Sequence, residues 1–128
     1  MDRQNVSTDY RSITVAPYNP TIGAVIGNVD LTCPLMEIEV VELQRALTEH
    51  LVLFFRDQRL SLGDQLRFAE YFGKIGRHVG RKTNSEPTDD PRIRRFHSGG
   101  NKLDVSGNVW HSDQSCAPVP PLASVLYL

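Results

Sequence analysis

The chain has 128 residues, with 14 basic and 15 acidic side chains, a formal net charge of −1 and 40% hydrophobic residues. This length favours one domain, and the composition excludes a wholly disordered protein. The balanced charge argues against nucleic-acid binding, and the longest apolar run, residues 51–55, is far shorter than the about 20 residues of a membrane helix. Cys33 and Cys116 lie too far apart for a CxxC metal site, and no apolar signal segment follows Met1. We therefore expect two reduced cysteines in a cytoplasmic protein.

The first predicted elements are two strands and a helix. Residues 1–11 are polar and are expected to be disordered or frayed, which leaves residues 12–128 as the domain. Short β-type runs at 13–15 and 24–26, with Pro and Gly residues between them, predict two strands joined by a loop.

The segment 34–50 predicts a helix, with Pro34 in its first turn, where a missing N–H costs nothing. Apolar side chains at helical spacing share one face, and the polar side chains lie mostly off it. The apolar set is Val40, Leu43 and Leu47; the polar set is Glu37, Glu42, Gln44 and Arg45.

A buried strand and a second helix follow. The short apolar run 51–55 ends in polar residues, which favours a buried strand. Ser61 and Asp64 then have the spacing of a capping box, which predicts the start of a helix. The apolar stripe of this helix would be Leu62, Leu66, Ala69 and Phe72, and the helix would end near Gly73.

Residues 74–108 contain many arginines, prolines and glycines, and predict a long irregular loop interrupted by one strand near 93–96. We interpret Arg92, Arg94 and Arg95 as a solvated strand edge in preference to an oxoacid clamp. The apolar segment 122–128 predicts a final strand. An apolar strand normally has a covering partner, so we expect this chain to be the front part of a longer protein.

The segment with chemical potential is 109–113, in which His111 and Asp113 are separated by one residue. On a strand, their side chains would share one face, with Cα atoms about 6.5–7 Å apart. An imidazole nitrogen and a carboxylate oxygen could then bind one cation. A third protein ligand would complete the two-His-one-carboxylate triad of non-haem Fe(II) oxygenases. A bare H-x-D pair also occurs by chance, so the context matters.

That context is an ordered set of short motifs. They are Ile22–Ile26 with Val29–Leu31, the strand-like run Leu51–Gln58, the helix-like segment Leu60–Gly73, and Trp110-His111-Ser112-Asp113 followed by Ser115, Pro118, Pro120 and Pro121. In this order they resemble the TauD/TfdA family, the taurine-dioxygenase-like Fe(II)- and 2-oxoglutarate-dependent oxygenases. The resemblance covers residues 13–128.

The resemblance implies a mixed α/β, mainly β fold: a double-stranded β-helix, or jelly-roll, with flanking helices, of which this chain would hold the N-terminal part. It implies that His111 and Asp113 bind Fe(II) and that 2-oxoglutarate is the cosubstrate. The reaction would use O2 to hydroxylate a small organic substrate, such as taurine or a related acid, and would release succinate and CO2. It names no nucleic-acid or membrane partner and leaves a homo-oligomer open.

Two functions of the family have no matching position here. The second metal His and the Arg that binds 2-oxoglutarate come far downstream of H-x-D in the family, whereas the 15 residues after Asp113 contain neither His nor Arg. This again indicates a piece of a longer enzyme. The alternative is a non-catalytic jelly-roll binding module that has lost both residues.

Several side chains remain open between a site role and a structural one. His78 resembles a substrate-contacting His of the taurine-type enzymes, with a solvated loop as the alternative. Asn108 lies near a substrate-contacting position of the family, but its offset from His111 is not that of the taurine enzymes. His50 is expected at a helix end and His97 in solvent. Trp110 would point to the opposite strand face, where core packing is expected.

Overall fold

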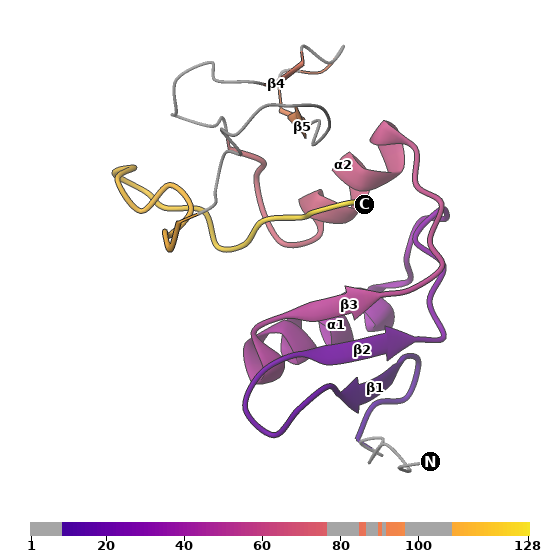
Figure 1. The fold of residues 1–128 in the computed structure, drawn as a ribbon. Helices are drawn as coiled ribbons and strands as arrows, with labels where there is room; N and C mark the ends of the chain where they lie inside the picture. Colours follow the sequence, from indigo (N-terminus) through magenta and orange to yellow (C-terminus); the bar gives the residue numbers. More distant parts are fainter. Residues whose placement is uncertain (1–8, 77–84, 87–89, 91, 97–108) are drawn as a thin grey trace. The chain divides into compact units, whose positions relative to one another are not determined.

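The computed structural model describes residues 9–76, 85–86, 90, 92–96 and 109–128. The elements, in chain order, are β1 (Thr14–Pro17), β2 (Ala24–Gly27), α1 (Glu37–His50), β3 (Leu53–Phe55), α2 (Leu62–Glu70), β4 (Ser85–Glu86) and β5 (Arg95–Phe96) (Figure 1). The chain divides into two compact units, Met1–Tyr71 and Phe72–Leu128. The first unit contains a small mixed sheet and both helices.

The sheet of the first unit has the order β1-β2-β3. β1 runs antiparallel to β2, with Val15 opposite Ile26, and β3 runs parallel to β2, with Phe55 opposite Ile26. A parallel pair needs a crossover connection, and α1 supplies it, lying along one face of the sheet (Figure 1). The strands predicted at 13–15, 24–26 and within 51–55 are therefore confirmed.

The core of this unit lies between the sheet and α1. Val15, Ala24 and Ile26 are buried on the sheet, and Leu43 and Ala46 are buried on α1. Val15 and Ile26 are cross-strand partners and so share one face of the sheet. The predicted apolar face of α1 is confirmed at Leu43.

Helix α1 begins at Glu37, three residues later than the predicted start at Pro34. The Met36 N–H donates to Glu39 Oε2 at 2.7 Å, which satisfies one of the unpaired donors of the first turn. The helix ends at His50, and Leu51 adopts φ 65° while its N–H donates to the Leu47 carbonyl at 2.8 Å. His50 thus lies in the last turn, as predicted, where a cation suits the helix dipole.

A buried carboxylate on α1 holds the segment that leads into β1. The expectation that Glu42 lies off the buried face is wrong, because Glu42 is only 7% exposed. Its Oε1 accepts from the Arg11 N–H at 2.7 Å, and its Oε2 accepts from the Ser12 N–H, the Ser12 hydroxyl and the Ile13 N–H at 3.0, 2.7 and 3.1 Å. Arg11, Ser12 and Ile13 are therefore held against α1.

Tyr10 lies in the same segment and is also buried. Its hydroxyl donates to Glu49 Oε2 at 2.7 Å, and the Arg45 guanidinium lies 4.9 Å from its ring centroid. Burial, reinforced by the hydrogen bond to Glu49, raises the pKa of Tyr10 to about 12. We call residues 9–13 the N-terminal strap, because two acidic side chains of α1 fix it to the helix.

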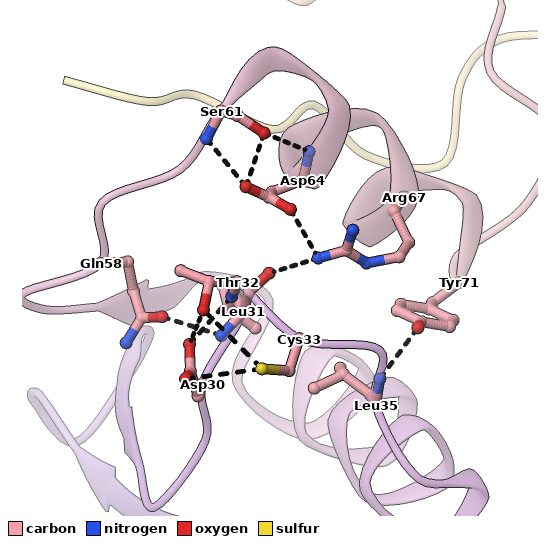
Figure 2. Close-up of polar contacts among 10 residues, drawn as sticks. All are labelled: Asp30, Leu31, Thr32, Cys33, Leu35, Gln58, Ser61, Asp64, Arg67 and Tyr71. Carbon is pink, nitrogen blue, oxygen red and sulfur yellow. Dashed lines mark hydrogen bonds and ion pairs between the residues drawn. The ribbon is translucent and has the colours of Figure 1, made fainter.

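The predicted capping box at the start of α2 is confirmed. The Asp64 N–H donates to the Ser61 hydroxyl at 3.2 Å, and the Ser61 N–H donates to Asp64 Oδ2 at 2.9 Å. Arg67 donates to the other Asp64 oxygen at 2.7 Å and to the Leu31 carbonyl at 3.0 Å (Figure 2). The cap of α2 is thereby tied to the loop that precedes α1.

Two further hydrogen bonds hold the same loop. The Leu31 N–H donates to Gln58 Oε1 at 2.9 Å, and the Leu35 N–H donates to the Tyr71 hydroxyl at 2.9 Å (Figure 2). Phe68 is the buried side chain of α2, and its ring packs edge-to-face against the ring of Phe55, with the ring centroids 5.1 Å apart. The predicted stripe of α2 omitted this residue, and the helix ends at Glu70, before the predicted stop near Gly73.

In the second unit, β4 and β5 form an antiparallel pair, with Glu86 opposite Arg95. The strand predicted at 93–96 is confirmed at Arg95–Phe96. The strand predicted at 122–128 is wrong for the structure as described: no described residue pairs with this segment, and Leu122, Leu126 and Leu128 are exposed. Apolar sequence alone does not form a strand without a hydrogen-bonding neighbour.

Candidate functional site

The segment 109–113 brings the two candidate metal ligands together, although not as the expected strand. Gln114 has φ 50°, and the Ala117 N–H donates to the Gln114 carbonyl at 2.9 Å. The backbone therefore turns directly after Asp113, and no described residue pairs with this segment as a strand neighbour. The strand prediction for this segment is wrong, and the turn accounts for the local geometry.

The imidazole of His111 is oriented by the backbone. Its Nδ1 lies 2.7 Å from the Val109 carbonyl oxygen. A carbonyl can only accept a hydrogen bond, so Nδ1 carries the proton in this contact, and Nε2 of the neutral ring presents a lone pair. Such a contact from the second ring nitrogen is typical of histidines that bind metals.

His111 Nε2 and Asp113 Oδ1 are 3.3 Å apart, and both side chains are about half-exposed. A neutral Nε2 and a carboxylate oxygen are both acceptors, so a cation between them would stabilise their close approach. Metal bonds of about 2.1 Å at right angles would place two donor atoms about 3.0 Å apart. The donor types and their separation therefore fit adjacent positions on one octahedral ion.

The second oxygen of Asp113 has its own partner. The Ser124 hydroxyl donates to Asp113 Oδ2 at 3.2 Å, from a position 11 residues further along the chain. Sequence reasoning missed Ser124, because no fixed spacing connects a serine to a carboxylate across a proline-containing loop. The carboxylate thus presents one oxygen to His111 and the other to Ser124.

Two ligands do not complete a metal site by themselves. Within the described ranges, no group of three or more His, Cys, Asp or Glu side chains could hold a metal ion. No helix in those same ranges is both long and apolar enough to cross a membrane.

The comparison with protein families agrees with the order of motifs. The family described as "Taurine catabolism dioxygenase TauD, TfdA family" matches residues 14–128. The chain belongs to this family. The match covers the whole sheet, both helices and the 109–113 segment, so the resemblance found in the sequence over residues 13–128 is confirmed.

Individual TauD/TfdA relatives are similar over most of this chain. An (S)-phenoxypropionate/alpha-ketoglutarate-dioxygenase from Sphingobium herbicidovorans is 31% identical over 112 residues, covering 87% of this chain and 38% of that protein. An alkylsulfatase from Acinetobacter baylyi is 36% identical over 107 residues, covering 82% of this chain and 32% of that protein. The chain thus spans about a third of the length of these relatives.

A solved structure supports the same relationship. A taurine dioxygenase from Burkholderia xenovorans has a TM-score of 0.56 and 33% sequence identity, covering 63% of this chain and 28% of that one. The fold of the matched part is therefore that of TauD/TfdA proteins.

Of the other residues predicted at or near the site, the structure describes only some. His78, His97 and Asn108 lie outside the described residues. Trp110 is fully exposed, at 103%, so the expectation that it packs in a core is wrong for the described structure. Cys33 and Cys116 are free and exposed in the described structure.

Proposed function

We propose that the whole protein is an Fe(II)- and 2-oxoglutarate-dependent dioxygenase, with His111 and Asp113 as two of its metal ligands. The observation that carries the proposal is the 3.3 Å approach of His111 Nε2 to Asp113 Oδ1 in a TauD/TfdA chain. When bound, iron with 2-oxoglutarate and O2 would supply the oxidation, giving succinate, CO2 and a hydroxylated substrate. The chain's own residues would hold and orient these groups.

The remaining parts of the proposal follow from family membership. The mixed sheet and the second unit would belong to a double-stranded β-helix with flanking helices, formed by the whole protein. The second metal His and the Arg for 2-oxoglutarate would belong to the rest of the whole protein, since the chain spans about a third of the length of its relatives. Guanidinium suits a carboxylate because it can donate two parallel hydrogen bonds.

The substrate would be a small organic anion. Relatives are named for phenoxypropionate and 2,4-dichlorophenoxyacetate, as an alkylsulfatase and as a taurine dioxygenase, which supports a carboxylate, sulfate or sulfonate group. We assign His78 and Asn108 to substrate binding within this proposal. An imidazolium or amide can donate a hydrogen bond to such an anion.

The function is tested by measuring succinate from the whole protein with Fe(II), 2-oxoglutarate, O2 and a panel of aryloxyalkanoates, sulfonates and alkyl sulfates. We expect succinate and hydroxylated product in equal amounts with one class of anion, and neither product when Fe(II) or 2-oxoglutarate is omitted. An anion that binds without any succinate formation would contradict the enzyme and support the binding-module alternative.

The assignment of His78 has a separate expected result. Loss of a hydrogen bond to a charged group costs about 1.5–3 kcal/mol, so His78→Ala should raise KM for the anion by about 10- to 100-fold. Slow decarboxylation of 2-oxoglutarate without substrate should persist, since the metal ligands are intact. Steady-state kinetics would check this, with His97→Ala, for which no substrate contact is proposed, as the control. An unchanged KM in His78→Ala would return His78 to a solvated loop.

A further inference from the structure

We propose that Ser124 is a positioning residue that fixes the Asp113 carboxylate for metal binding, an inference that rests on the proposed function. The Ser124 hydroxyl donates to Oδ2 at 3.2 Å, while Oδ1 lies 3.3 Å from His111 Nε2. Each carboxylate oxygen therefore has a separate partner. This arrangement directs Oδ1, and not Oδ2, toward the point where the imidazole lone pair is aimed.

Ser124 matters because little else holds this carboxylate. The Asp113 side chain is 61% exposed, and among the described residues its polar contacts are those with His111 and Ser124. Without the hydroxyl, the carboxylate would rotate freely about its terminal torsion, which is broad for aspartate. A metal would then have to fix that rotation when it binds, at a cost in affinity.

The chain between Asp113 and Ser124 is suited to hold this contact in advance. It contains Pro118, Pro120 and Pro121, whose rings fix φ and reduce the number of conformations open to the loop. The support of His111 comes instead from the backbone carbonyl of Val109, which no side-chain substitution removes. Ser124 is therefore the described side chain through which the support of this ligand pair can be tested.

A second serine pair provides a matched control. The Ser112 hydroxyl donates to the Ser115 hydroxyl at 2.7 Å, in the same segment. Ser115→Ala removes one hydroxyl and one hydrogen bond, as Ser124→Ala does, but it leaves both Asp113 oxygens with their partners. A general effect of losing a serine near the site would therefore appear in both variants.

The test is a titration of the whole protein with Co(II) alone, followed by its visible absorption, with wild type, Ser124→Ala, Ser115→Ala and His111→Ala compared. Loss of a hydrogen-bonding partner of a metal ligand typically lowers affinity by about 10- to 100-fold. We expect that loss, with altered absorption bands, in Ser124→Ala. We expect wild-type behaviour in Ser115→Ala and no tight binding in His111→Ala.

Ser124→Thr and Ser124→Val form a second pair that has nearly equal shape and differs in the hydroxyl. We expect the Thr variant to bind Co(II) nearly as the wild type does and the Val variant to bind as weakly as Ser124→Ala. Equal affinities in Thr and Val would overturn the role of the hydroxyl. If Ser124→Ala binds Co(II) as the wild type does while His111→Ala does not, the positioning role of Ser124 is overturned but the metal site stands. If the wild-type protein itself does not bind Co(II), both the metal site and the role of Ser124 are overturned.

Discussion

Alanine at His111 is expected to remove tight Fe(II) binding and all turnover from the whole protein, and alanine at Asp113 to do the same. The two donor atoms lie 3.3 Å apart, so each would occupy one of adjacent positions on the ion. Removing one ligand of a facial triad leaves the metal with two protein ligands. We expect affinity to fall by at least about 100-fold, more than the loss of an outer partner typically costs.

The measurement is iron content after anaerobic reconstitution and gel filtration, with succinate formation as the second readout. Cys116→Ala is the matched control, because its thiol is free, exposed and only three residues beyond Asp113. It should retain iron, since the proposed site uses no thiolate. Iron held at the wild-type level by both the His111 and Asp113 variants would remove these residues from the metal site.

Local signals were sufficient where the interacting groups are close in the sequence. Ser61 and Asp64 satisfy each other's backbone N–H groups across one turn, so the start of α2 could be predicted from the sequence alone. The H-x-D pair is similar: residues two positions apart stay close on a strand or in a turn. His111 and Asp113 therefore approach each other even though the strand prediction was wrong.

Long-range partners could not be predicted in this way. The apolar character of Trp110 predicts a core residue, and that of the segment 122–128 predicts a strand. Burial of a side chain needs a surface to pack against, and a strand needs a neighbouring strand edge, and the local sequence specifies neither. Among the described residues none pairs with 122–128 as a strand neighbour, and Trp110 is exposed. The contact of Ser124 with Asp113 likewise depends on the course of a loop.

Glu42 is the clearest case of a role hidden from sequence. A helical pattern assigns charged residues to the solvent side, which is correct when their charge has no buried partner. Here the partners are backbone N–H groups of the N-terminal strap, about thirty positions away. Backbone donors carry no sequence signature, so nothing in the pattern of α1 distinguishes Glu42 from its exposed neighbours.

Glu42→Gln is expected to lower the free energy of unfolding at pH 7 by about 2 kcal/mol, the scale of hydrogen bonds to a charged group. Glutamine has nearly the same shape but only one acceptor oxygen, so its amide NH2 must face at least one N–H donor of the strap. Urea denaturation of the whole protein measures the difference. Glu37→Gln, an exposed position in the first turn of the same helix, is the control and should change stability by less than about 1 kcal/mol.

The effect should depend on pH in a defined direction. Burial alone would raise the pKa of Glu42, but the hydrogen bonds from Ser12, Arg11 and Ile13 outweigh burial and lower the pKa from 4.5 to about 2. A carboxylate with a lowered pKa in the folded state stabilises fully above its unfolded pKa and loses that contribution as pH falls toward the folded pKa. The stability difference between wild type and Glu42→Gln should therefore be constant from pH 7 to about 5 and shrink between about pH 4.5 and 2.

Hydrogen exchange can locate the same effect in the strap. The Arg11, Ser12 and Ile13 amides donate to Glu42, so exchange at one or more of them should accelerate in Glu42→Gln at neutral pH. The amide of Leu51, which donates to the Leu47 carbonyl, should be less affected. Wild type should approach the variant's behaviour as Glu42 becomes protonated. An equal stability difference at pH 7 and pH 3, with unchanged exchange at Arg11, Ser12 and Ile13, would show that Glu42 does not hold the strap through its charge.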